Sequence, residues 1–230
     1  MFAGHIGAGL AIGSAERRVN VGLFVAAASL LDIALWLLVL VGCESVVIPY
    51  DFTRTHQAEF VFPYSHSLAA GVVWSALAAG AAWAAFARLG TARIRFALLI
   101  AAAVFSHWLL DVLVHRPELP LAGATSTLMG LGLWNSVPVA LVTEGSIVML
   151  GLFLFIPRCG LPRGRYIAIA ALSILILAFT VAGMTLAPPP PSGLAMAGSS
   201  FVTLGAVCAL MAWFGRLPSE GQAHTGARPD

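Results

Sequence analysis

Six hydrophobic runs in this chain are each long enough to cross a lipid bilayer, and they constrain the fold more than any other feature. They cover about residues 20–43, 66–87, 95–115, 136–156, 165–187 and 194–215. A helix needs about 20 apolar residues to cross the hydrocarbon core. The chain is 60% hydrophobic and 10% charged, whereas soluble domains carry about 25% charged residues. We therefore expect an all-α, polytopic membrane helix bundle with about six transmembrane helices.

The two ends of the chain differ from these runs. Residues 2–13 are apolar and rich in small residues but too short to span. Small residues allow close helix packing in membranes, so we expect a half-helix inserted beside the first span, with a surface helix as the alternative. In a signal peptide, basic residues precede the apolar region. Here Arg17 and Arg18 follow it, so we do not expect the segment to be a cleaved signal peptide. We predict an integral membrane domain over 1–216 and a disordered cytoplasmic tail over 217–230.

The arginines predict the orientation. The chain has twelve basic residues, all of them Arg, and only Arg54 and Arg116 fall on one side of the predicted spans. The other ten lie on the opposite side, which the positive-inside rule makes cytoplasmic, together with both termini. The net charge of +2 is too small to suggest nucleic-acid binding. The three cysteines lie far apart and form no Cys-x-x-Cys pair of the kind found in zinc knuckles.

Several ionisable residues interrupt the hydrophobic runs. Asp32, His107, Asp111 and Glu144 lie inside them, and His66 begins the second run. A charge in hydrocarbon costs several kcal/mol unless it is paired, bound to a metal or facing a polar cavity. Helical rise places Asp32, His107 and Glu144 roughly 16–18 Å above the cytoplasmic edge, with Asp111 about 6 Å higher. We therefore expect these residues to form one polar site in the outer half of the membrane.

The residue types suggest a metal. His107 and Asp111 are four apart and share one face of a helix, so both can bind one ion, although a purely structural His–Asp hydrogen bond has the same spacing. Asp32 and His66 are the other expected ligands, and His5 joins them if the first segment inserts. Asp32 could instead be protonated and bound to a backbone carbonyl. Glu144 could be a general base, a ligand, part of a proton path, or a structural hydrogen-bond acceptor.

The order of these residues resembles a known family. His5, Asp32, Ser65-His66-Ser67 and His107-x-x-x-Asp111 are similar to the pattern of YdjM-like bacterial inner-membrane proteins, a family regarded as metal-dependent hydrolases. The same order is similar to that of the zinc-dependent phospholipase C group. The resemblance covers about residues 1–156. It differs where Leu31 stands in place of the family's Pro and where Tyr64-Ser65 replaces the Thr before the histidine. It implies a bacterial inner-membrane location.

The sequence thus favours a membrane hydrolase with a divalent metal, preferably zinc. Asp32, His66, His107 and Asp111 would bind the metal, with His5 possible, and Glu144 would act as the base or support the site. The substrate would be an ester or phosphoester of a lipid-like molecule from the bilayer. Two other classes remain open: a transporter or permease that binds protons or a cation at this site, and a non-catalytic membrane scaffold.

Overall fold

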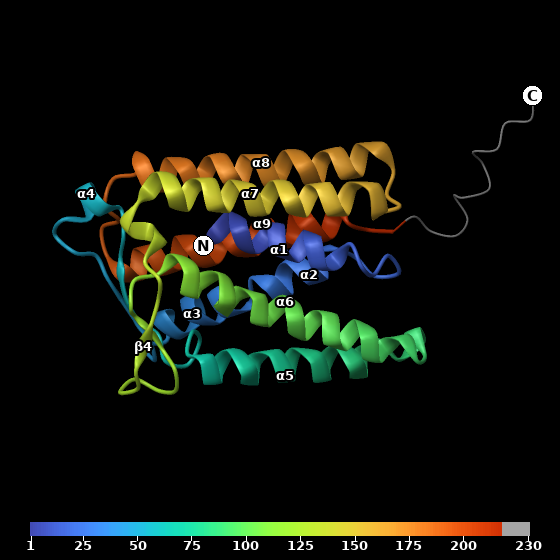
Figure 1. Cartoon of the computed structure of the whole chain (residues 1–230), viewed down its shortest axis with the longest axis horizontal. Coiled ribbons are helices and arrows are strands. Elements are labelled where there is room, and N and C mark those ends of the chain that lie inside the picture. The colour runs from blue at the N-terminus through green and yellow to red at the C-terminus, as the bar shows by residue number, and fades with distance from the viewer. Residues whose placement is uncertain (218–230) are drawn as a thin grey trace, which may run out of the picture.

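The chain folds into a bundle of long helices that carries two small β-hairpins at one end (Figure 1). The structure is a computed structural model and describes residues 1–217. The predicted tail lies outside the described residues except for its first residue. In chain order the helices are α1 (Phe2–Gly13), α2 (Gly22–Ala28), α3 (Leu30–Leu40), α4 (Phe52–Thr55), α5 (Leu68–Ala85), α6 (Ala92–Val114), α7 (Val137–Phe155), α8 (Arg163–Thr185) and α9 (Gly193–Phe214).

Short elements close the ends of the bundle. Strand β1 (Ser45–Val47) pairs antiparallel with β2 (Glu59–Val61), and β3 (Leu119–Pro120) pairs antiparallel with β4 (Leu128–Met129). These hairpins and α4 define what we call the strand end. The opposite end carries Arg17, Arg18, the 3-10 helices η1 (Ala87–Leu89) and η3 (Ile156–Arg158), and the start of α8. We call it the arginine-rich end. A third 3-10 helix, η2 (Leu133–Asn135), lies just before α7.

Six segments of the bundle correspond to the six predicted spans. Five helices are long and apolar enough to cross a membrane: α5, α6, α7 with η3, α8 and α9. Helices α2 and α3 together form a sixth candidate. Large apolar side chains such as Leu98, Val142 and Val202 are exposed on the outside of the bundle, where a bilayer would cover them. The all-α helix bundle is therefore confirmed.

The first predicted span is not one continuous helix. Helices α2 and α3 meet at Ser29 with a bend of 56°. At the break, the carbonyl oxygen of Ala28 lies 2.7 Å from Nδ1 of His107. A side chain that inserts into the backbone hydrogen-bond ladder is a recognised cause of a helix kink. The bend therefore turns a backbone carbonyl toward the buried histidine.

Helix α1 is inserted into the bundle, as the half-helix prediction proposed. Eight of its twelve residues are buried, and it contacts α2, α6, α7 and α8. The helices come very close: a Cβ atom on Gly7 would lie 2.6 Å from the carbonyl oxygen of Ile147 on α7. Helix α1 begins beside α6 inside the bundle and runs toward the arginine-rich end, so His5 lies deep in the protein.

The arginine-rich end has its own polar contacts. Arg18 donates to both carboxylate oxygens of Glu16, at 2.8 and 2.6 Å, and this pairing lowers the pKa of Glu16. Arg95 donates to the carbonyl of Ala15 at 2.6 Å. The Arg18–Glu16 pair lies within the turn that follows α1, and the Arg95 contact joins that turn to the start of α6. Which side of a membrane this end faces stays a prediction.

The close approach of α1 and α7 can be tested by Gly7→Ala. The added methyl group meets backbone atoms of α7, so we expect overpacking to destabilise the protein by about 1–3 kcal/mol. Gly80→Ala is the matched control, because no atom lies within 4 Å of a Cβ there and Ala favours a helix over Gly. Thermal unfolding in detergent measures both. An unchanged melting temperature for Gly7→Ala would contradict the inserted packing of α1.

Candidate metal centre

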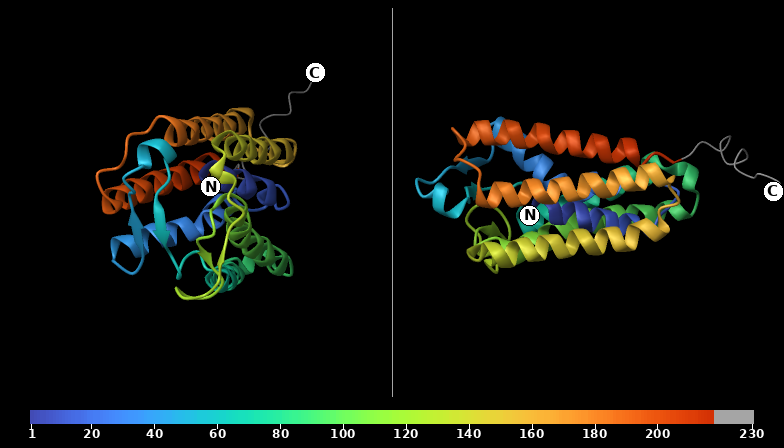
Figure 2. Two further views of the ribbon diagram at one scale, coloured as in Figure 1. Left: turned by 60° about the vertical axis from the view of Figure 1, so that its left-hand side comes forward. Right: turned by 90° about the horizontal axis from the view of Figure 1, so that it is seen from above.

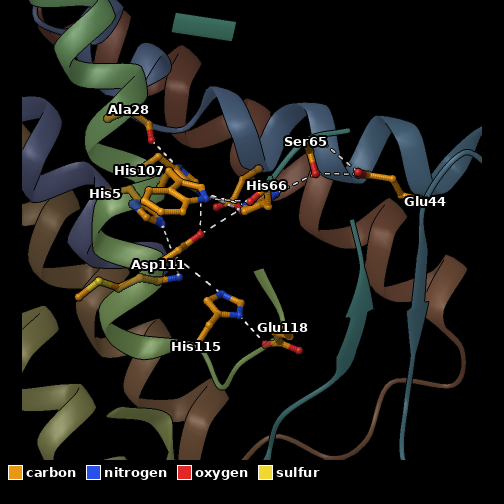
Figure 3. A network of polar contacts seen from close by, with 12 residues as sticks. His5, Ala28, Glu44, Ser65, His66, His107, Asp111, His115 and Glu118 are labelled. Carbon is orange, nitrogen blue, oxygen red and sulfur yellow. Dashed lines mark hydrogen bonds and ion pairs between the residues drawn. The ribbon is translucent and has the colours of Figure 1, made fainter. Parts of the chain in front are cut away.

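Four of the predicted ligands form one cluster: His66, His107 and Asp111 lie together in Figure 3, and Asp32 lies 3.6 Å from both histidines. Asp32 lies in the first turn of α3, just after the break at Ser29, and His66 lies two residues before α5. His107 and Asp111 lie one turn apart on α6, as their spacing predicted. The side chains of His66, His107 and Asp111 are at most 2% exposed, and that of Asp32 is 18% exposed.

The donor atoms of these residues are spaced as metal ligands are. Nε2 of His66 and Nε2 of His107 are 3.2 Å apart. Oδ2 of Asp111 lies 3.4 Å from the first and 3.1 Å from the second, and Oδ1 of Asp32 lies 3.6 Å from each. Ligands about 2.0–2.1 Å from a tetrahedral ion are separated from one another by about 3.3 Å. The five distances between ligand atoms, 3.1–3.6 Å, lie close to that value, so these atoms could surround one ion.

The protonation of His107 follows from its outward contact. Nδ1 of this ring lies 2.7 Å from the carbonyl oxygen of Ala28, which can only accept a hydrogen bond. Nδ1 must therefore carry the proton. In the neutral imidazole, Nε2 then presents a lone pair toward His66 and the two aspartates. The break between α2 and α3 thus sets the tautomer that a metal ligand needs.

A second chain of hydrogen bonds sets the tautomer of His66. Glu44 accepts from the backbone N–H groups of Tyr64 and Ser65, each at 2.8 Å. Its other oxygen lies 2.7 Å from Oγ of Ser65, so the serine donates its single proton to the carboxylate. Oγ must then accept from Nδ1 of His66, 2.8 Å away. Nε2 of His66 consequently also presents a lone pair inward.

These contacts leave four acceptor atoms facing one another in a buried space. Two imidazole lone pairs and two carboxylate oxygens repel one another unless a positive charge lies between them. Protons or a metal ion can supply that charge, and the spacing and tautomers suit a metal. Buried His and Asp groups that can hold a metal ion are therefore present in this protein. The identity of the ion belongs to the proposal below.

His5 lies against the same cluster. Its ring stacks on that of His107, with centroids 3.6 Å apart and planes 8° apart. Nε2 of His5 lies 3.1 Å from Oδ1 of Asp111, and the Met1 nitrogen lies 3.2 Å from the same oxygen. Among residues 1–217, Nδ1 of His5 has no hydrogen-bond partner, and the contact of Nε2 with Asp111 has the distance of an ion pair but not the geometry of a hydrogen bond. His5, Asp32 and His107 also form a group whose ligand atoms lie within 4.8 Å of one another.

Glu144 lies near the cluster but makes different contacts. It is 1% exposed on α7 and accepts from the backbone N–H groups of Ala3 and Gly4, at 2.9 and 3.2 Å. It therefore satisfies two of the free N–H groups at the start of α1, where the helix dipole favours a negative charge. Glu144 also lines the cavity beside the cluster. Its role as a base stays a prediction.

Sequence reasoning missed two residues of this region. Glu44 is a loop residue whose contacts with Ser65 depend on the tertiary fold. His115 follows Asp111 by one further turn, so the repeated spacing of His107, Asp111 and His115 was an available signal. Nδ1 of His115 lies 2.5 Å from Oε1 of Glu118, and Nε2 lies 3.9 Å from Oδ1 of Asp111.

A cavity of about 380 Å³ adjoins the cluster on one side. Its ionisable lining residues are Asp32, His56, His66, His115 and Glu144. Aromatic and other apolar side chains form most of the remainder, including Trp36, Phe62 and Phe179. Ligand cavities in proteins usually have volumes of about 300–1,000 Å³ and mostly apolar walls with a few convergent polar groups. The space beside the cluster therefore has the size and character of a ligand site.

The hydrogen-bond chain behind His66 can be tested by Ser65→Ala. Without Oγ, Nδ1 of His66 loses its acceptor and the ring can adopt the wrong tautomer or rotate. Loss of such a supporting contact typically lowers metal affinity about 10–100-fold, and we expect a decrease of that size in zinc titrations. Ser106→Ala is the control, because Ser106 adjoins His107 but bonds only to the carbonyl of Ala103. Equal affinities for the two variants would contradict the assigned role of Ser65.

Comparison with family models, with curated proteins and with solved structures finds no match to this chain. The resemblance to YdjM-like proteins therefore stays a prediction, and the assignment of this site rests on its own geometry.

Proposed function

We propose that this protein is a metal-dependent membrane hydrolase that acts on an ester or phosphoester of a lipid-like substrate. The observation that carries the proposal is the inward-facing set of acceptor atoms on His66, His107 and Asp111, which are 3.1–3.4 Å apart and have both histidine tautomers set from outside. A divalent ion is the simplest group that satisfies all of them.

Zinc is the preferred ion because histidine nitrogens and carboxylate oxygens in a tetrahedral arrangement are typical of it. When bound with an open position, it lowers the pKa of a water molecule to about 7 and polarises an ester oxygen. His66, His107 and Asp111 would hold the ion. Asp32 is more exposed and faces the cavity, so it would complete the ligand set on the side where a substrate approaches.

Glu144 is the proposed base. It lines the same cavity as Asp32 and His66, and only its Oε2 is used to cap α1. The other carboxylate oxygen would accept a proton from the attacking water. The apolar cavity walls would exclude bulk water from the reaction and would hold the apolar part of the substrate.

In this proposal the protein lies in a bilayer, and its lipid-like substrate comes from the same bilayer. The positive-inside rule would place the arginine-rich end in the cytoplasm of a bacterial cell and the cavity in the outer half of its inner membrane. The long apolar helices support a membrane location.

One observation also favours a transporter or permease. The broken pair α2 and α3 places Asp32 directly after a helix break, and interrupted helices frequently form the ion sites of transporters. That function would give ion flux across proteoliposomes without bond cleavage. Flux and hydrolysis assays on the same preparation separate the two proposals.

The metal site is tested by the double variant His107→Ala/Asp111→Ala. Elemental mass spectrometry of protein purified with zinc and without chelator should show near-stoichiometric zinc in the wild type. The variant should lose this zinc, because two of the three closest donors are gone. His56→Ala is the control, because it removes a cavity-lining imidazole outside the cluster. Wild-type protein without any bound metal would overturn the metallohydrolase proposal.

The base is tested by Glu144→Gln. The amide oxygen can still accept from Ala3 and Gly4, so we expect a melting temperature close to that of the wild type. General-base catalysis contributes typically about 10²–10⁴-fold, and kcat on an ester substrate should fall within that range while zinc content is unchanged. A kcat equal to the wild-type value would restrict Glu144 to its structural role at α1.

A further inference from the structure

The cavity beside the cluster is partly enclosed by the two last helices, α8 and α9, which lie beyond the residues that suggested a hydrolase. In Figure 2 (right) they run side by side along one face of the bundle, with α8 between α9 and α7. Toward the arginine-rich end they share a buried cluster that includes Ile169 and Ile176 of α8 and Val207 and Met211 of α9. In the half of the bundle near the arginine-rich end, α8 and α9 therefore pack against the core and leave no part of the cavity between them.

Toward the strand end, the inner faces of the same helices line the cavity instead. Helix α8 contributes Thr180, Gly183 and Met184, and α9 contributes Met196 and Ser200. Gly183 has no atom within 4 Å of the position that a Cβ would occupy. The cavity therefore extends into the space between α8 and α9 in this half of the bundle.

Two of the residues that line the cavity have exposed side chains, which makes them candidates for its opening. Phe179 of α8 is 59% exposed, and Ser199 of α9 is exposed as well. Phe179 lies six residues before the end of α8 and Ser199 six residues after the start of α9, so each is about 9 Å below the strand end of its helix. The hydrocarbon core is about 30 Å thick, which places this opening at the depth of lipid chains. The neighbouring Leu175 and Val202 are 65% and 69% exposed, as expected of lipid-facing residues.

From these positions we infer that the gap between Phe179 and Ser199 is a lateral portal through which one hydrocarbon chain of a bilayer lipid enters the cavity. Lipid chains surround the opening at this depth, and the walls behind it are mainly apolar. Met184 and Met196 are flexible apolar side chains that adapt to an irregular occupant. The polar wall at Asp32 and His66 would then meet the head of the same molecule. Only this last point rests on the proposed hydrolase function.

The portal is tested by photolabelling of the full-length chain in phosphatidylcholine vesicles. The probe is a phosphatidylcholine that carries a diazirine along one acyl chain, and peptide mass spectrometry locates the adducts. In the wild type we expect adducts on the cavity walls, at Trp36, Met184 and Met196, in addition to outward-facing residues. Adducts confined to outward-facing residues such as Leu175 and Val202 would overturn the inference.

Gly183→Trp provides the decisive variant. A Cβ at this position meets no atom within 4 Å, and the indole beyond it is expected to fill the inner space, so adducts on Trp36 and Met196 should fall to the level of an unirradiated sample. Ser200→Trp blocks the same space from the opposite wall and should give the same result. Gly205→Trp is the matched control, because Gly205 is an exposed α9 residue that does not line the cavity. Undiminished cavity adducts in both blocking variants would overturn the portal.

Hydrolysis assays keep this inference separate from the proposed function. If the protein is a hydrolase, Gly183→Trp should raise KM for a long-chain ester more than KM for a water-soluble short-chain ester, whereas Gly205→Trp, outside the cavity lining, should raise neither. Equal KM values for the long-chain ester in Gly183→Trp and Gly205→Trp would contradict the portal while leaving the hydrolase intact. Cavity labelling without any ester cleavage would support the portal and contradict the hydrolase.

Discussion

The structure depends on keeping four acceptor atoms close together in the interior of the bundle, three of them on side chains that are at most 2% exposed. The inner atoms of Asp32, His66, His107 and Asp111 lie 3.1–3.6 Å from one another along the measured pairs, inside a bundle whose surface is apolar. Charges and lone pairs in such surroundings are costly unless a positive charge compensates them. The surrounding elements hold these groups in place despite that cost.

Several unusual features of the fold serve this arrangement. The break between α2 and α3 exposes the carbonyl of Ala28 to His107. The loop before α5 and the turn between α3 and β1 bring Ser65 and Glu44, respectively, behind His66. Helix α1 inserts through small residues and brings His5 against His107. Each of these features departs from a bundle of continuous, straight helices, and each positions one member of the cluster.

The sequence predicted those parts of the protein that depend on local spacing. Hydrophobic length gave the six spans, and the four-residue interval placed His107 and Asp111 on one face. The small residues of α1 correctly indicated close packing. The break at Ser29 was missed because its partner is 79 residues away from Ala28 in the chain. Glu44 was missed for the same reason, since its contact with Ser65 exists only after the loop folds. The cavity wall was missed because α8 and α9 look like ordinary spans in sequence.

The direction of the hydrogen bonds bears on the choice between a scaffold and a metal centre. Polar residues that only join helices are expected to direct donors toward acceptors in the bundle interior. Here Nδ1 of each central histidine donates outward, to Ala28 and to Ser65, and the inward atoms are acceptors. This is the arrangement that a histidine needs as a metal ligand, with the second nitrogen fixed by a supporting acceptor. A purely structural role would leave the inward lone pairs of His66 and His107 opposed at 3.2 Å unless a proton lay between them. The geometry therefore gives the cluster the ligand atoms that a metal ion needs, in addition to the contacts that it makes between helices.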